Sequence, residues 1–215
     1  MKTTTSQVDE FRRTLLAQAA GYQTELNDLE IARLSRYYEL LLAWNPRLHL
    51  VAPCPAAEFA TRHVLESLLL LPHLPPEARI ADVGSGAGLP IIPVLVARAD
   101  IRAVIIEPSQ KKSVFLREAL AVTATSAQAT VIAERFESIP TPDVNYVTCR
   151  ALDRFIELFP KLVQWSPQPS NLLLFGADTL RKQIENAALN FIAVKIPESE
   201  RRFLFVVERR NHGAG

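Results

Sequence analysis

A glycine-rich turn with an acid in front of it carries the chemistry that this sequence encodes most clearly. Gly84, Gly86 and Gly88 alternate after a short apolar run that contains Asp82. Glycine tolerates positive φ and lets the backbone approach a ligand, and a helix beginning beyond the turn offers unpaired N–H groups. The pattern therefore predicts a site for a polar ligand between the end of a strand and the start of a helix.

The spacing of this turn differs from that of two glycine-rich loops that bind phosphates, the dinucleotide fingerprint and the nucleoside triphosphate loop. A dinucleotide fingerprint needs a sixth-position glycine in G-x-G-x-x-G, where this chain has Leu89, so an NAD-linked oxidoreductase is disfavoured. No lysine follows the last glycine, as a nucleoside triphosphate loop requires. A second acid, Glu107, ends the next apolar run, where acids suit ribose hydroxyls. The acid-x-G-x-G-x-G pattern resembles motif I of class I S-adenosylmethionine methyltransferases.

Other candidates follow the ends of later predicted strands, because ligands of open α/β sheets lie beyond the carboxyl ends of the strands. A sulfonium cofactor needs an acid for its ribose, an apolar wall and backbone donors for adenine, and glycine backbone near its amino-acid end. Two alternatives stay open, namely Arg150 as an anchor for Glu137 and Phe136 as a core residue. The predicted cofactor-binding residues are Asp82, Gly84, Ser85, Gly86, Gly88, Leu89, Glu107, Phe136, Glu137 and Arg150.

The elements that must position these residues change in kind along the chain. Apolar residues at helical spacing predict three helices before residue 72, the second over about 25–43 and ended by Asn45-Pro46. Prolines at 72, 75 and 76 indicate a linker. Beyond it, strand-length apolar runs alternate with helical runs, and two strands close the chain without a helix between them. We therefore predict an N-terminal helical lobe, 1–76, and an α/β domain, 77–215. Its sheet is expected to be doubly wound and mostly parallel, with seven strands and a C-terminal antiparallel hairpin.

Bulk composition narrows the classes of protein. The chain has 215 residues, 48% of them hydrophobic, and a net charge of +1, so RNA contact would need local basic patches. Cys54 and Cys149 provide neither a disulfide framework nor zinc spacing, so we expect no metal site and a reducing, cytoplasmic setting. The polar first residues and the absence of a long apolar run predict neither a signal peptide nor a membrane span.

Motifs along nearly the whole chain resemble the glucose-inhibited-division B (GidB) family, the RsmG-type guanine-N7 methyltransferases of bacterial small-subunit ribosomal RNA. The matching segments are 44–50, 62–67, 82–93, 107–117, 135–137, 149–152 and 200–202. The resemblance implies a class I methyltransferase fold, S-adenosylmethionine as cofactor and ribosomal RNA or a ribosomal particle as partner. It implies an RNA-facing side at the helical lobe with Arg62 and His63. Arg201 and Arg202 form a basic rim that could meet phosphates, and we expect a monomer.

The implied chemistry needs no general base, because guanine N7 carries a lone pair and no proton. His49, Val51, Ile91, Phe175 and Arg202 depart from the usual family residues, and they affect the substrate half more than the cofactor half. Alternatives therefore stay open: a methyltransferase acting on another RNA, a protein or a small molecule, or a catalytically weak RNA-binding paralogue.

Overall fold

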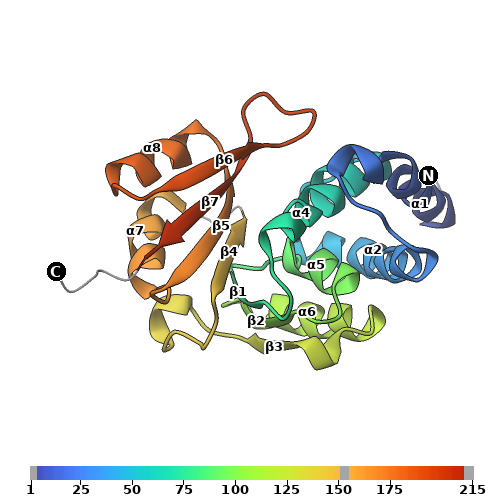
Figure 1. The fold of residues 1–215 in the computed structure, drawn as a ribbon. Helices are drawn as coiled ribbons and strands as arrows, with labels where there is room; N and C mark the ends of the chain where they lie inside the picture. The colour runs from blue at the N-terminus through green and yellow to red at the C-terminus, as the bar shows by residue number, and fades with distance from the viewer. Residues whose placement is uncertain (1–3, 151–154, 211–215) are drawn as a thin grey trace.

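One mixed sheet organises the computed structural model, which describes residues 4–150 and 155–210 (Figure 1). Its strands are β1 (Arg79–Val83), β2 (Arg102–Ile106), β3 (Ala129–Ile132), β4 (Tyr146–Arg150), β5 (Ser170–Gly176), β6 (Phe191–Lys195) and β7 (Phe203–Arg209). They lie in the order β3-β2-β1-β4-β5-β7-β6. Strands β1 to β5 run parallel to one another, and β7 pairs antiparallel with β5 and β6. The predicted seven-stranded sheet with its closing hairpin is thus confirmed.

The strand order reverses between β1 and β4, which makes the carboxyl ends of these two strands the topological switch point. Central strands are apolar on both sides, as in β5, where Leu172, Leu173 and Leu174 are all fully buried. Helices can therefore cover both faces. Ala151 and Leu152 of the matching motif follow β4 in the sequence and lie outside the described residues.

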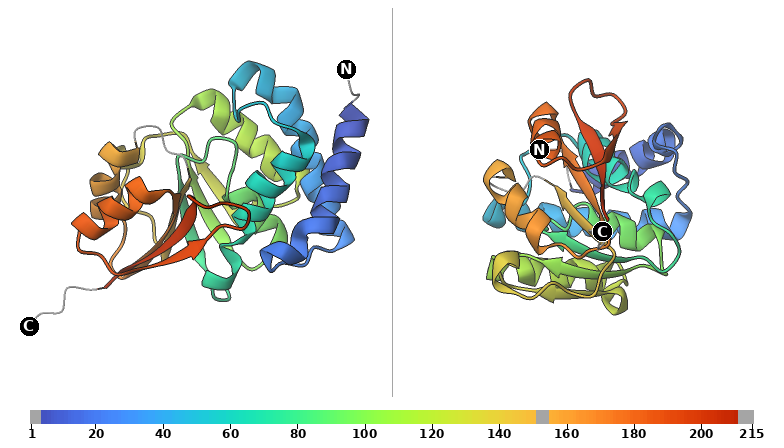
Figure 2. Two further views of the ribbon diagram at one scale, coloured as in Figure 1. Left: turned by 90° about the horizontal axis from the view of Figure 1, so that it is seen from above. Right: turned by 60° about the vertical axis from the view of Figure 1, so that its left-hand side comes forward.

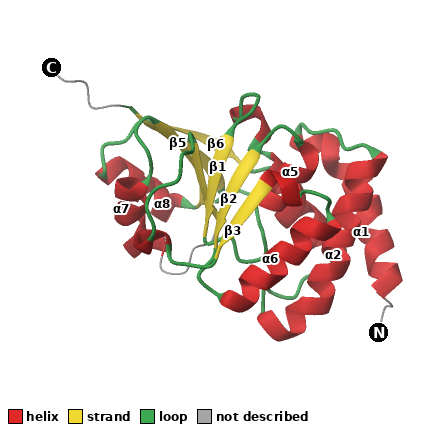
Figure 3. Cartoon of the chain, turned by 90° about the horizontal axis from the view of Figure 1, so that it is seen from below, coloured by secondary structure: helices red, strands yellow, loops and turns green. Residues whose placement is uncertain are grey.

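Helices cover the sheet unequally on its two faces (Figure 3). The described helices are α1 (Thr4–Gln18), α2 (Asp28–Leu48), α3 (Ala56–Glu58), α4 (Glu66–Leu68), α5 (Ile91–Ala97), α6 (Gln110–Val122), α7 (Phe155–Trp165) and α8 (Asp178–Asn186). A π-helical segment, Phe59–Leu65, joins α3 to α4. Helices α7 and α8 pack on one face, while α5, α6 and the N-terminal helices pack on the other.

The N-terminal helices share a hydrophobic core with the sheet. Phe11 stacks on Tyr38 with ring centroids 4.6 Å apart, and Tyr38 stacks on Phe59 at 4.9 Å. These rings belong to the same buried cluster as Ile80 and Ile105 of the sheet. The division at residue 76 stays a prediction, and the packing surface between its two parts is mainly apolar.

Two local signals set the ends of α2. Asn27 forms a capping box with Glu30 at the N-terminus, which satisfies two backbone N–H groups. The helix continues through Pro46 to Leu48, past the end that Asn45-Pro46 indicates. Beyond this end the side chain of Asn45 holds the chain, because its amide donates to the carbonyl of Val51 and accepts from the N–H of Val51, both at 3.0 Å. This clamp folds the segment after α2 back onto the helix end.

Among the described residues, no helix combines the length and the apolar character needed to cross a membrane.

Candidate functional site

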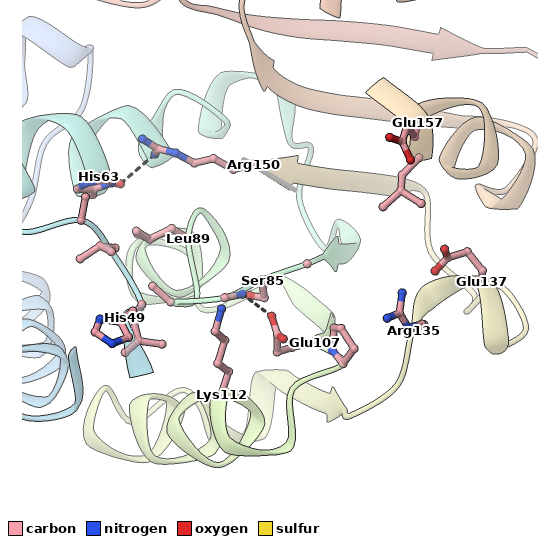
Figure 4. Close-up of a pocket in the computed structure, with 18 of the residues that line it drawn as sticks. His49, His63, Ser85, Leu89, Glu107, Lys112, Arg135, Glu137, Arg150 and Glu157 are labelled. Carbon is pink, nitrogen blue, oxygen red and sulfur yellow. Dashed lines mark hydrogen bonds between the residues drawn. The ribbon is translucent and has the colours of Figure 1, made fainter. Parts of the chain in front are cut away.

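A cavity of about 930 Å³ lies beyond the carboxyl ends of β1, β2 and β4, beside the switch point (Figure 4). This volume is at the upper end of the range for small-molecule sites. The predicted site residues that line it are Gly84, Ser85, Gly86, Leu89, Glu107, Glu137, Arg150 and His63. The fold therefore brings together most of the residues predicted to bind a cofactor.

The glycine turn adopts the backbone that its residue types predict. Gly84, Gly86 and Gly88 have φ values of 71°, 55° and 84°, in the left-handed region that favours glycine. The turn is held at both ends: the N–H of Gly84 donates to Ile106 O at 2.9 Å, and the Tyr37 hydroxyl donates to Ala87 O at 2.7 Å. Gly88 does not line the cavity, and it serves instead for close packing.

Glu107 is fixed at the end of β2 and turned toward the glycine turn. Its Oε2 accepts from the N–H of Gly86 and its Oε1 from the N–H of Ser109, both at 2.9 Å. The side chain is only 5% exposed. A carboxylate oxygen can accept more than one hydrogen bond, so this carboxylate keeps acceptor capacity for ligand hydroxyls.

Asp82 lies beneath the turn, fully buried, and does not line the cavity. Its Oδ2 accepts from the Ser85 hydroxyl, while Oδ1 is buried with no hydrogen-bond partner among the described residues. Burial raises the pKa of Asp82 to about 8; the Ser85 hydrogen bond opposes the rise and the charge of Glu107 adds to it. This carboxyl is therefore mainly protonated at neutral pH.

Arg150, at the end of β4, contacts the N-terminal helices and not Glu137. Its guanidinium donates to the carbonyl of Arg62, to that of His63 at 3.4 Å, and to Glu66 Oε2 at 3.1 Å. The first two carbonyls belong to the π-helical segment, a distortion often found at functional sites. Figure 4 shows Arg150 reaching toward His63 and away from Glu137.

The predicted RNA-facing residues occupy different surroundings. Arg62 forms an ion pair with Glu58, and Arg202 donates to Glu66 Oε2 at 2.7 Å. Arg201 is exposed and lies outside the cavity lining. His63 lines the cavity, and burial, with the charges of nearby arginines, lowers its pKa to about 3. His63 is thus neutral at physiological pH.

Phe136 lies in the core beneath the cavity. It is 4% exposed and packs edge-on against Trp165 with ring centroids 5.5 Å apart. The backbone around it still reaches the site, because Arg135 and Glu137 on either side line the cavity.

Several cavity-lining residues were not singled out as site residues from the sequence: His49, Leu50, Val51, Ala52, Ala87, Pro108, Lys112, Glu157, Leu158 and Lys161. The segment after α2 reaches the cavity through the Asn45 clamp, and an Asn beside a proline at a helix end is a usable signal for such a loop. The exposed face of α7 carries no comparable signal, because its residues read as an ordinary helix surface.

The residues at the glycine turn meet the requirements for binding S-adenosylmethionine. The turn leaves open space where side chains would sit, since a Cβ on Gly86 would meet only Gly84 O, at 3.8 Å. Glu107 offers an anchored acid, and the buried Asp82 Oδ1 lies under the same turn without a partner among the described residues. The residues present fit this cofactor.

A family sequence model and individual relatives all point to one family of proteins. The sequence model of the GidB family, described as rRNA small subunit methyltransferase G, matches residues 30–207. The chain is 39% identical over 162 residues to ribosomal RNA small subunit methyltransferase G of Sorangium cellulosum, covering 72% of this chain and 67% of that one. It is 32% identical over 197 residues to the protein of that name from Dichelobacter nodosus, covering 90% and 93%.

A solved structure shows the same fold at low identity. The ribosomal protein L11 methylase of Lactobacillus delbrueckii subsp. bulgaricus aligns with a TM-score of 0.56 and 11% identity, covering 69% of this chain and 79% of that one.

Proposed function

This chain belongs to the GidB family of rRNA small subunit methyltransferase G proteins, and from that premise we propose that it methylates N7 of a guanine in small-subunit ribosomal RNA. S-adenosylmethionine is the methyl donor. One observation carries the proposal: the cavity at the switch point joins a left-handed glycine turn to an anchored acid, Glu107. We also propose that the protein works in the cytoplasm as a monomer.

Bound S-adenosylmethionine would supply an electrophilic methyl group. Glu107 would hold the ribose, and the backbone at Gly84 and Gly86 would hold the amino-acid end. The N7 lone pair can attack without losing a proton, so the residues need to orient and desolvate the base and not to deprotonate it. His63, neutral beside the cavity, is consistent with this chemistry, because its imidazole adds no positive charge that would attract the lone pair.

We expect calorimetry to show S-adenosylmethionine binding to the unmodified protein, with the affinity reduced about tenfold in Glu107→Gln. The amide has nearly the shape of the carboxylate but lacks the charge that strengthens hydrogen bonds from ribose hydroxyls. Its NH2 group would also face the N–H of Gly86 or of Ser109, so one of the two hydrogen bonds that fix the side chain is lost. Glu185→Gln, an exposed carboxylate on α8, is the matched control and should bind normally. Absence of binding by the unmodified protein would contradict the proposed cofactor.

The substrate is tested separately. Mass spectrometry of ribosomal RNA from a deletion strain should show the loss of one N7-methylguanine in the small-subunit RNA, restored by the intact gene. An unchanged nucleoside profile, together with normal cofactor binding, would indicate a methyltransferase with another substrate.

The phosphates of an RNA substrate could contact basic side chains that line the cavity. Lys112, Arg135 and Lys161 line it, and within 4–150 and 155–210 none of the three lies in an ion pair. We propose that they contact RNA phosphates. The double variant Arg135→Gln/Lys161→Gln should raise the KM for RNA about tenfold near physiological salt and reduce the salt dependence of binding.

The control for this prediction is Lys182→Gln/Lys195→Gln, which removes two exposed cations outside the cavity lining. Equal effects of the two double variants would indicate a diffuse charge effect and would contradict a phosphate site at the cavity.

A further inference from the structure

One buried carboxylate holds two arginines together beside the cavity. Glu66 is 1% exposed, and its Oε2 accepts from Arg150 Nη2 at 3.1 Å and from Arg202 Nη1 at 2.7 Å. Arg150 lines the cavity, whereas Glu66 and Arg202 lie behind it. Arg202 comes from the loop between β6 and β7, which reaches the N-terminal helices at this point (Figure 2).

The cluster around the Glu66 carboxylate carries a net positive charge. Glu66 offsets one of its two arginines, which leaves one net positive charge in the group of three. His63 is neutral, and the charge of Arg62 is matched by Glu58. Burial raises the pKa of Glu66, and the two guanidinium groups oppose that rise. With two cationic donors on one oxygen, we take the carboxylate as ionised at neutral pH.

Glu66 is poorly placed to act by contact, since it does not line the cavity. Its charge still acts there, because a buried region screens charges much less than water does. The guanidinium of Arg150 is itself shielded, at 13% side-chain exposure, and lies over the Phe175 ring at 5.3 Å. The field at this wall of the cavity therefore depends on whether Glu66 carries its negative charge.

We propose that Glu66 sets the preference of the cavity for the sulfonium donor over its thioether product. The inference rests on the proposed function and extends it. S-adenosylmethionine and S-adenosylhomocysteine have nearly the same shape, but the donor carries one more positive charge, on sulfur. Without Glu66, two arginines would be uncompensated, Arg150 in the cavity wall and Arg202 behind it. Their charges would oppose the sulfonium and have little effect on the neutral thioether.

The test measures the dissociation constants of both ligands by calorimetry and compares their ratio, which is insensitive to a general loss of packing. Glu66→Gln should raise the ratio of donor to product dissociation constants about threefold to tenfold. Arg202→Gln should lower the ratio about twofold, because it removes a cation and leaves the Arg150–Glu66 pair. Glu185→Gln makes the same charge change as Glu66→Gln at an exposed position on α8, outside the cavity lining, and should leave the ratio unchanged.

Opposite shifts in the Glu66 and Arg202 variants would support the inference. If Glu66→Gln does not fold, the less buried Arg202 still provides the test through its predicted sign. Normal donor binding with an unchanged ratio in both variants would overturn the inference alone. Failure of the unmodified protein to bind either ligand would overturn the proposed function as well.

Discussion

Gly88→Ala is expected to lower the free energy of unfolding by about 4 kcal/mol and to abolish cofactor binding. Gly88 has a φ of 84°, which strains any residue with a side chain. A Cβ there would also lie 2.3 Å from Ile92 Cδ1 and 3.2 Å from Leu116 Cδ2. Ile92 and Leu116 are fully buried, so neither side chain can move away without disturbing the core.

Urea denaturation and calorimetry would measure these two effects. Gly86→Ala provides a graded control, because its φ of 55° is strained but its Cβ would meet only Gly84 O at 3.8 Å. Gly86→Ala should lower the free energy of unfolding by about 1 kcal/mol. Gly21→Ala, with nothing within 4 Å of its Cβ, should be close to neutral. A Gly88→Ala protein as stable as Gly21→Ala would refute the packing argument.

The second large effect is a dependence of the free energy of unfolding on pH that arises from Asp82. The pKa of the Asp82 carboxyl is about 8 in the folded protein, against an ordinary value of 3.8. Between these values the unfolded chain has released this proton and the folded protein has kept it. The contribution of Asp82 therefore makes stability fall as pH rises, by up to about 1.4 kcal/mol per pH unit, or about 4 kcal/mol from pH 5 to pH 8.

Asp82→Asn should remove this slope, so that the variant gains stability relative to the unmodified protein as pH rises. Chemical denaturation at several pH values would measure the difference, in which the titration of all other groups largely cancels. Asp143→Asn, which changes an exposed carboxylate, should leave the slope as it is. Parallel stability curves for the unmodified protein and Asp82→Asn would show that Asp82 does not retain its proton.

The sequence predicts the sheet well because its signals are local. Buried parallel strands read as continuous apolar runs, as at Leu172 to Leu174, and the glycine turn needs its residue types at fixed spacing. Gly84 and Glu107 line the cavity as expected, because each follows directly from a strand end. The predicted end of α2 is too early: the helix continues through Pro46, although the residue before a proline is biased away from helical backbone. The Asn45 clamp beyond the helix end depends on a loop conformation that composition does not report.

The partners of charged residues were less predictable, because they are set by distant parts of the chain. Arg150 has Glu66 as its carboxylate partner, 84 positions away, where local reasoning offered Glu137. Arg202 turns inward to the same carboxylate, although its neighbour Arg201 is exposed. Phe136 lies next to Trp165 in the core, so hydrophobic burial determined its place.

The hydrogen bond from Tyr37 to the carbonyl of Ala87 joins positions 50 residues apart. A helix from the first part of the chain thereby shapes the turn assigned to the methyl donor in the second. Chimaeras that exchange residues 1–76 between relatives would consequently transplant a portion of the donor pocket along with the helices. Both ends of that contact have to be inherited together.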